Sequence, residues 1–251
     1  MAENSIKEIL TDYGFEQFTD SIALSRFTAL TDRLVSENKK YNLTSISEPG
    51  DIIVKHYIDS LAVLKFFNFE NNKNIIDIGA GAGFPSLPLM IARGDLDITP
   101  LDSSNKKVYY INRTVKELFG DEKKPPTICG RAEILALDTS QRERYDYAVS
   151  RAVARLNILL ELTVPFLKPG GVFIAYKGSD GERELGEIKR GSWEKLNCEY
   201  IDSARYDIED KTLSRRQGGE PFSRVLIMIR KTAPTPPGYP RRYAVMKTSP
   251  M

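Results

Sequence analysis

The chain has 251 residues, 41% hydrophobic and 28% charged, which is typical of a folded globular protein and excludes disordered or fibrous classes. Two cysteines and one histidine are too few for a disulfide framework or a zinc site. No apolar run reaches the ~18 residues that a membrane span needs, and the polar N-terminus lacks a signal-peptide pattern. These features predict a cytoplasmic protein with no membrane association and no bound metal.

The charges balance in total but not in position. Lysine and arginine number 36 against 34 acidic residues, so the net charge of +2 is too small for indiscriminate nucleic-acid binding. After Glu220, however, the chain contains only basic charged residues. Such a terminus suits a phosphate-rich partner, and it also suits a solvated tail that aids solubility.

Residues 1–70 are expected to form a helical N-terminal extension. Apolar residues recur at spacings of three and four, first around Phe27 and Leu30 and again around Tyr57 and Leu61. Between these two stretches, the segment 41–51 contains Pro49 and Gly50 and is expected to be a loop.

Residues 71–232 alternate between short apolar runs and longer helix-like stretches. The runs begin with NIIDIG at Asn74 and continue with DITPLD, TICG, YDYAVSR and GVFIAYKG. This alternation predicts a parallel sheet with helices on both faces. Two late runs, LNCEYIDSARYDI and RVLIMIR, have no helical stretch between them and are expected to pair as antiparallel edge strands. Residues 233–251 are proline-rich and are expected to be an extended basic tail that lies against the domain or reaches for a partner.

A glycine-rich loop follows the first predicted strand. Gly79, Gly81 and Gly83 alternate, with Asp77 two residues before the first of them. Glycine permits positive φ and close approach of a ligand, although the same pattern also fits a tight structural turn. A dinucleotide fingerprint would place its third glycine where this chain has the bulky Phe84, and no phosphate-binding P-loop motif is present.

Asp102 ends the second predicted strand. In open α/β sheets, a carboxylate at this place can accept hydrogen bonds from both hydroxyls of a ribose. Its simpler role would be to cap the helix predicted to start nearby. The distance between Asp102 and the glycine loop favours the ribose interpretation.

The loop resembles motif I of class I S-adenosylmethionine-dependent methyltransferases, and further segments narrow the resemblance. KKYNLTSI, KHYIDSL, DIGAGAGFPSLPL, LDSSNKK, GRAE, SRAVARL, LKPGG, YKG and APTPPGYPRR occur in this order between Lys39 and Arg242. Together they resemble the RsmG (GidB) family of 16S ribosomal RNA guanine-N7 methyltransferases. The resemblance implies a Rossmann-like α/β fold with a mostly parallel seven-stranded sheet, S-adenosyl-L-methionine as cofactor, and the 16S ribosomal RNA of the small subunit as partner. Ser86 departs from the family, which often has glycine there, and Pro100 interrupts the second strand.

The resemblance also implies site residues. The expected cofactor-binding residues are Gly79, Gly81, Gly83, Phe84, Asp102, Ala132, Glu133 and Arg151. The cations expected to contact RNA are Arg151, Arg155, Lys177, Arg241 and Arg242, because arginine can stack on a base or bind phosphate bidentately. Salt bridges are an even alternative for Arg155, and are disfavoured for Arg241 and Arg242 because no acid lies near them in the sequence.

The chemistry of guanine N7 agrees with the scarcity of catalytic motifs. The N7 lone pair is free at neutral pH and its methylation releases no proton, so we expect no catalytic base and a rate that comes from in-line positioning. The segment after the fourth strand lacks the N/D-P-P-Y/F turn of amino-directed enzymes. Neither Cys129 nor Cys198 has a base near it in sequence, which disfavours a cysteine nucleophile. His56 is expected to be a partly buried structural residue that helps to place the helical extension.

Other functions stay open on the sequence alone. A nicotinamide oxidoreductase could use the same sheet, although Phe84 disfavours it. An RNA-binding assembly factor could retain the fold without activity, and a methyltransferase could act on a protein or a small molecule. We expect a monomer, and the sequence does not identify the target guanine.

Overall fold

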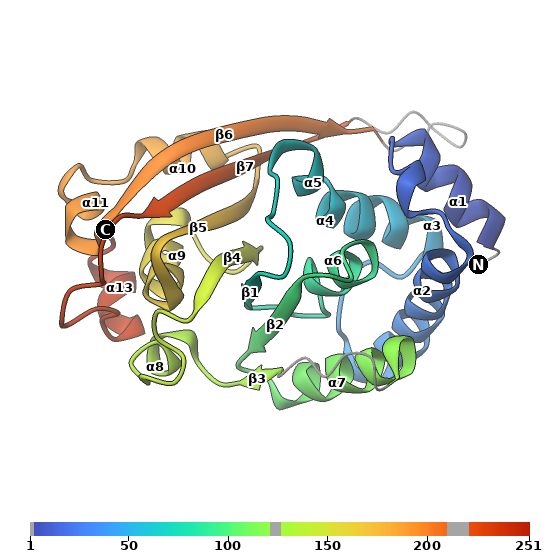
Figure 1. Ribbon diagram of the computed structural model, residues 1–251, viewed down its shortest axis with the longest axis horizontal. Helices are drawn as coiled ribbons and strands as arrows, with labels where there is room; N and C mark the ends of the chain where they lie inside the picture. The colour runs from blue at the N-terminus through green and yellow to red at the C-terminus, as the bar shows by residue number, and fades with distance from the viewer. Residues whose placement is uncertain (1–2, 121–126, 210–220) are drawn as a thin grey trace.

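The computed structural model describes residues 3–120, 127–209 and 221–251 (Figure 1). In these ranges the strands form one seven-stranded sheet in the order β3-β2-β1-β4-β5-β7-β6. The strands are β1 (Asn74–Ile78), β2 (Asp97–Asp102), β3 (Ile128–Cys129), β4 (Tyr145–Arg151), β5 (Leu167–Gly178), β6 (Cys198–Ile208) and β7 (Phe222–Lys231).

Strand pairing confirms the predicted, mostly parallel sheet. β1 pairs in parallel with β2 and β4, and the parallel ladder continues to β3 on one side and β5 on the other. β7 is antiparallel to both β5 and β6, so the two late runs pair as predicted, with β6 at the edge. Pro100 lies inside β2 without ending it. β3 pairs only with Leu101 and Asp102, so β2 is locally an edge strand at Pro100, where a missing N–H is tolerated.

The N-terminal segment is helical, as predicted. Its elements are α1 (Glu3–Asp12), η1 (Glu16–Phe18), α2 (Ser21–Tyr41), α3 (Pro49–Ile52), the π-helix η2 (Ile53–Ile58), α4 (Asp59–Leu61) and α5 (Val63–Phe66). The loop predicted over 41–51 is present at 42–48, but the prediction is wrong from Pro49 onward, where α3 begins. Proline suits a first helical position, where its missing N–H costs no hydrogen bond.

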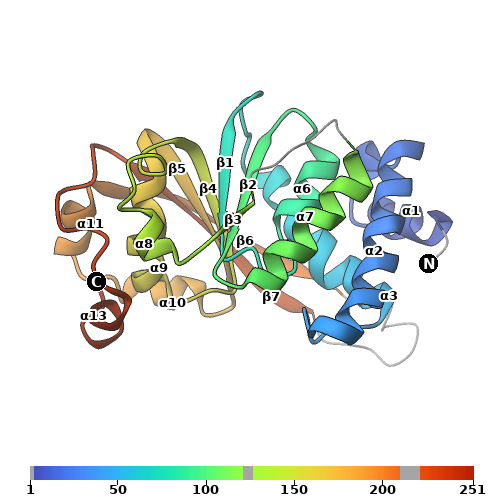
Figure 2. The ribbon, with the colours of Figure 1, turned by 90° about the horizontal axis from the view of Figure 1, so that it is seen from below.

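Helices cover both faces of the sheet, as Figure 2 shows. The remaining helices are α6 (Ser86–Ala92), α7 (Asn105–Phe119), α8 (Ala132–Leu135), α9 (Leu156–Thr163), η3 (Val164–Phe166), α10 (Gly181–Gly186), α11 (Gly191–Leu196) and α13 (Tyr243–Thr248). The N-terminal helices, α6 and α7 lie on one face, and α8 to α11 and α13 lie on the other.

Successive residues of β1 face two separate cores. Ile75 packs into a cluster with Phe27 and Leu30 of α2, whereas Ile76 packs into a cluster with Leu159 of α9. The helical extension therefore shares a core with the sheet. The division into residues 1–70, 71–232 and 233–251 stays a prediction.

The C-terminal segment lies against the protein, which is one of the two placements expected for it. Residues 243–248 form α13, and Met246 is fully buried in the second core. The expectation of an extended tail is therefore wrong for α13, where burial of an apolar side chain favours a helical turn. Within the described ranges, no helix combines the length and apolarity that crossing a membrane requires.

Candidate functional site

The glycine loop connects β1 to α6 and needs glycine at each alternating position. Gly79, Gly81 and Gly83 have φ of 76°, 60° and 90°, which is the left-handed region that disfavours other residues. A Cβ on Gly79 would also overlap the side chain of Val153, which follows β4. The loop therefore packs directly against the end of β4.

Asp102 joins the end of β2 to this loop. Its Oδ2 accepts a hydrogen bond from the Gly81 N–H at 3.0 Å, and its Oδ1 accepts one from the Ser104 N–H at 2.9 Å. The Lys107 ammonium lies 3.6 Å from Oδ2. The N-cap of α7 is Ser104, so Asp102 is not the capping residue that the simpler interpretation of the sequence required.

A cavity of about 350 Å³ opens at the carboxyl ends of the parallel strands. It is lined by Ile78, Gly79, Leu101, Asp102, Ser103, Lys107, Gly130, Arg131, Ala132, Glu133, Ala152, Val153, Leu162 and Tyr243. Its volume lies within the ~300–1,000 Å³ range of small-molecule sites. The end of the strands where it opens is also where doubly wound sheets bind ligands.

The cavity brings together four of the eight predicted cofactor residues. Gly79, Asp102, Ala132 and Glu133 line it. Glu133 is buried and accepts a hydrogen bond from the Arg131 Nε at 2.5 Å. Gly81 and Gly83 shape the loop beside the cavity, while Phe84 and Arg151 lie in the packing around it and are not among the described residues that line it.

Phe84 packs on the helical extension through His56. The two rings stack with their centres 4.4 Å apart. The Arg151 guanidinium donates to His56 Nδ1 at 2.8 Å, so Nε2 carries the proton and donates to Thr44 Oγ1 at 3.0 Å. Burial, and secondarily the charge of Arg151, lower the pKa of His56 to about 3. The histidine is therefore neutral and structural, in line with its predicted role.

Arg151 points toward the helical extension. Its Nε lies 3.2 Å from Asp59 Oδ2, and Asp59 is almost fully buried. Asp59 also accepts from the Tyr206 hydroxyl at 2.8 Å and pairs with the Arg224 Nε at 3.3 Å. The residue after Arg151, Ala152, has φ of 58°, a left-handed conformation rare for alanine that turns the chain from β4 into the cavity wall.

Asp77, the acid of the glycine motif, is fully buried under the loop. The Ser86 hydroxyl donates a hydrogen bond to its Oδ2 at 2.5 Å. Ser86 stands where the family often has glycine, which could not make this bond. Its Oδ1 has no hydrogen-bond partner in the part of the chain that the structure describes. Burial raises the pKa of Asp77 to about 7, against the lowering effect of the Ser86 hydrogen bonds.

The cations predicted to contact RNA differ in how much of their charge is free. Arg241 forms an ion pair with Glu161 of α9 at 2.7 Å, so the expectation that it lacks an acidic partner is wrong. Lys177 lies 2.6 Å from Glu184 and is largely buried. Arg155 is half exposed and pairs with Glu187 of the chain following α10, whereas Arg242 is exposed. RNA contact by these residues stays a prediction.

Neither cysteine has a catalytic environment. Cys129 is exposed and its thiol donates to Asn105 Oδ1 at 2.9 Å. Cys198 is buried, and burial raises the pKa of its thiol to about 12. Among the described residues, no cluster of three His, Cys, Asp or Glu side chains could hold a metal ion.

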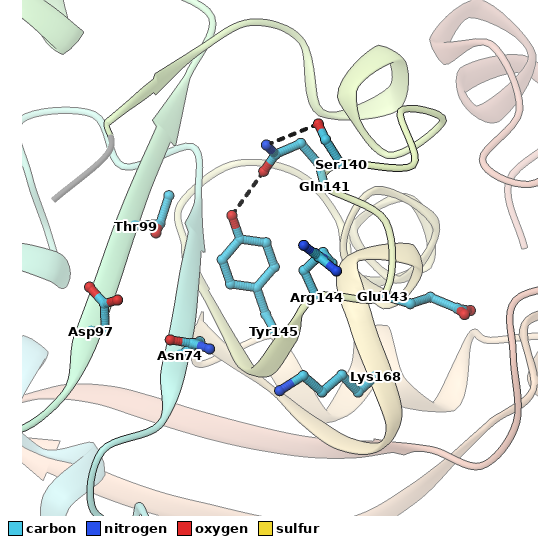
Figure 3. A pocket seen from close by; sticks show the side chains of 9 residues that line it. All are labelled: Asn74, Asp97, Thr99, Ser140, Gln141, Glu143, Arg144, Tyr145 and Lys168. Carbon is cyan, nitrogen blue, oxygen red and sulfur yellow. Dashed lines mark hydrogen bonds between the residues drawn. The ribbon is translucent and has the colours of Figure 1, made fainter.

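A second cavity, of about 450 Å³, lies at the opposite end of the strands (Figure 3). It is lined by Asn74, Asp97, Thr99, Ser140, Gln141, Glu143, Arg144, Tyr145 and Lys168. The Tyr145 hydroxyl donates to Gln141 at 2.9 Å, and Lys168 pairs with Asp146 at 2.8 Å. This larger cavity lies at the amino ends of the strands, so we assign the function to the smaller one, at the carboxyl ends.

Two residues that line the cavity, Val153 and Tyr243, were not predicted from the sequence. Val153 lies in a segment quoted for the family resemblance, but nothing in the pattern indicated that it packs on Gly79. Tyr243 had no signal at all, because only the path of the C-terminal segment brings it to the cavity.

Comparison with known proteins agrees with this geometry. Residues 23–204 match the family model described as rRNA small subunit methyltransferase G. The chain is 41% identical over 87% of its length to the ribosomal RNA small subunit methyltransferase G of Desulfitobacterium hafniense, covering 85% of that protein. It is 36% identical over 99% of its length to the protein of the same name from Clostridium botulinum strain Loch Maree, covering 97% of it. The crystal structure of the [4+2]-cyclase SpnF superposes with a TM-score of 0.51 at 15% identity over 70% of this chain and 82% of that one, which shows a shared fold only. The chain therefore belongs to the rRNA small subunit methyltransferase G family.

Proposed function

We propose that this chain transfers the methyl group of S-adenosyl-L-methionine to N7 of a guanine in the 16S ribosomal RNA of the small ribosomal subunit. The observation that carries the proposal is the cavity, where Gly79, Asp102, Ala132 and Glu133 meet at the carboxyl ends of β1 to β3. Family membership gives the proposal its substrate class. Its place of action is the cytoplasm, where ribosomal subunits are assembled, and it acts as a monomer.

The residues of the cavity fit an adenosyl ligand. The loop has three left-handed glycines and closes on Val153, so its backbone can approach a ligand without side chains intervening. Asp102 presents a carboxylate that can accept from ribose hydroxyls, while its existing bonds to Gly81 and Ser104 hold it in place. Ala132 and Glu133 would hold the adenine from the start of α8. When bound, S-adenosyl-L-methionine supplies an electrophilic methyl group on a sulfonium.

The protein has to position the guanine rather than activate it. N7 already carries a free lone pair, so alignment of the acceptor with the methyl group supplies the rate. His56, whose ring stacks on Phe84, is neutral with both ring nitrogens engaged, and Asp77 of the glycine motif is fully buried. Neither is available to an acceptor in the cavity. We assign the RNA contacts chiefly to Arg242 and Arg155, because Arg151, Lys177 and Arg241 are more deeply engaged in ion pairs.

The test is methyl transfer from labelled S-adenosylmethionine to small ribosomal subunits that lack the modification, followed by nucleoside analysis. Label in N7-methylguanosine is the expected result. A Gly79→Ala variant should transfer no label under the same conditions, and a Gly94→Ala variant, at an open surface position, should behave as the parent. Cofactor binding without transfer would overturn the acceptor assignment, and absence of cofactor binding would overturn the methyltransferase assignment.

A further inference from the structure

The C-terminal segment from Thr232 to Met251 is anchored to the protein before it reaches the cavity. The Arg142 guanidinium donates to the carbonyl oxygens of Thr235 and Tyr239 at 2.9 and 2.8 Å. Glu143, the next residue, accepts from the Thr235 N–H and from the fully buried Lys231 ammonium, each at 2.7 Å. One loop thus holds both the end of β7 and the segment that follows it.

Arg241 provides the next anchor. Glu161 of α9 is fully buried, and its carboxylate accepts four hydrogen bonds of 2.6 to 3.0 Å from the backbone N–H, Nε and Nη2 of Arg241. A buried carboxylate needs such a full set of donors to offset its lost hydration. Arg241 therefore fixes the C-terminal segment to α9.

The ion pair between Arg241 and Glu161 places α13 at the mouth of the cavity. Met246 of α13 is fully buried in the second core, and Tyr243, the first residue of α13, lines the cavity together with Leu162 of α9. The Arg131 guanidinium lies 5.2 Å from the centre of the Tyr243 ring and also pairs with Glu133. Tyr243 is thus next to the residues assigned to adenine and on the α9 side of the cavity.

We propose that Tyr243 is a binding residue of the adenosine subsite, and that the C-terminal segment is a built wall of the cofactor pocket. The inference rests on the proposed function. An aromatic ring and Leu162 supply flat apolar surface, while Glu133 supplies hydrogen-bond acceptors, and an adenine ring requires both. In this arrangement, the two arginines have different roles: Arg241 fixes the C-terminal segment to α9, and Arg242 remains exposed to RNA.

The test measures the affinity of three ligands by calorimetry: S-adenosylmethionine, S-adenosylhomocysteine and methylthioadenosine. Tyr243→Ala should weaken all three by the same factor of about 5–10, the magnitude expected for one lost aromatic contact. Equal loss is expected because the three share the adenosine that Tyr243 contacts. Tyr243→Phe should keep parental affinity, because the ring supplies the contact. Val245→Ala, at an exposed position of the same helix, is the matched control.

The outcomes separate the inference from the proposed function. Parental affinity in Tyr243→Ala, with the parent binding all three ligands, would overturn the inference alone. A parent that binds none of them would overturn the proposed function. A thermal melt of each variant without ligand distinguishes a lost contact from a lost fold, because Tyr243→Ala should melt within a few degrees of Val245→Ala. If the alanine variant unfolds, an unequal response of the three ligands to Tyr243→Leu would overturn the inference.

Discussion

The ion pair between Arg241 and Glu161 yields a quantitative prediction. Arg241→Ala removes three of the four hydrogen bonds to a carboxylate that has no solvent exposure and leaves only the backbone N–H as donor. Breaking a buried pair on one side costs ~3–5 kcal/mol. Because a quarter of the Arg241 side chain is exposed, water can replace part of the loss. We therefore expect the free energy of unfolding to fall by about 3 kcal/mol.

Urea unfolding measures this loss. Trp193, the single tryptophan, packs against the same core as α13, so its fluorescence reports on this face of the sheet while circular dichroism reports on the whole chain. Arg242→Ala, one residue away and exposed, should change the free energy of unfolding by no more than about 0.5 kcal/mol. The double substitution Arg241→Met with Glu161→Leu should recover most of the stability, since apolar replacements remove the stranded charge. A loss below about 1 kcal/mol in Arg241→Ala, or a double variant as unstable as the single one, would refute the reasoning.

Four further predictions follow from the site. Gly79→Ala should lower affinity for S-adenosylhomocysteine more than about tenfold, because the left-handed backbone and the overlap with a neighbouring side chain both oppose it; equal binding by this variant and Gly94→Ala would contradict this. The single histidine, His56, should show no titration of its NMR signals between pH 5 and 8, and a titration midpoint near 6.5 would count against its burial. The free energy of unfolding should fall as pH drops below about 6.5 toward the folded pKa of about 3, and His56→Gln should remove this dependence. For Asp77 the sign is opposite, because burial raises its folded pKa from 3.8 to about 7. Its contribution is fully present below about pH 4 and is lost as pH rises from there to about 7. The stability of Asp77→Asn relative to the parent should therefore improve between about pH 4 and 7 and stay level above, and a flat difference across that range would sink the argument. Arg242→Ala should weaken RNA binding and reduce the slope of its salt dependence by about one, with cofactor affinity unchanged; an unaltered slope would remove Arg242 from the RNA surface.

Local patterns predicted most of the fold. The apolar run at Asn74 became β1, and the segment NKKVYYINRTVKELF became α7 from Asn105 to Phe119. These elements follow from residue type and spacing over a few positions. The helix at Pro49 and the helix at Tyr243 were missed, because proline was taken to end structure in the first case and burial of Met246 stabilises the turn in the second.

The candidate site was predictable only where its residues are close in sequence or lie at strand ends. Gly79 follows β1 and Asp102 ends β2, and these two strands are parallel neighbours, so the topology brings the residues together. The partner of Arg241 could not be found in this way, because Glu161 is 80 residues earlier and the contact depends on the path of the whole C-terminal segment. The same holds for Arg151, which pairs with Asp59 of the helical extension, 92 residues earlier in the chain.

The burial of Asp59 has a consequence for how the chain folds during its synthesis. Its carboxylate is satisfied by Arg151, Tyr206 and Arg224, and the last of these lies 165 residues further along the chain. At ~5–20 residues per second, a ribosome needs roughly 8–33 seconds to make that stretch. During this time the N-terminal helices can form, but they hold a charge that has no partner in the fold. The native arrangement of the first helices is thus completed only after the last strand, β7, has been synthesised. The segment of the chain that is made first is therefore among the last to reach its native contacts.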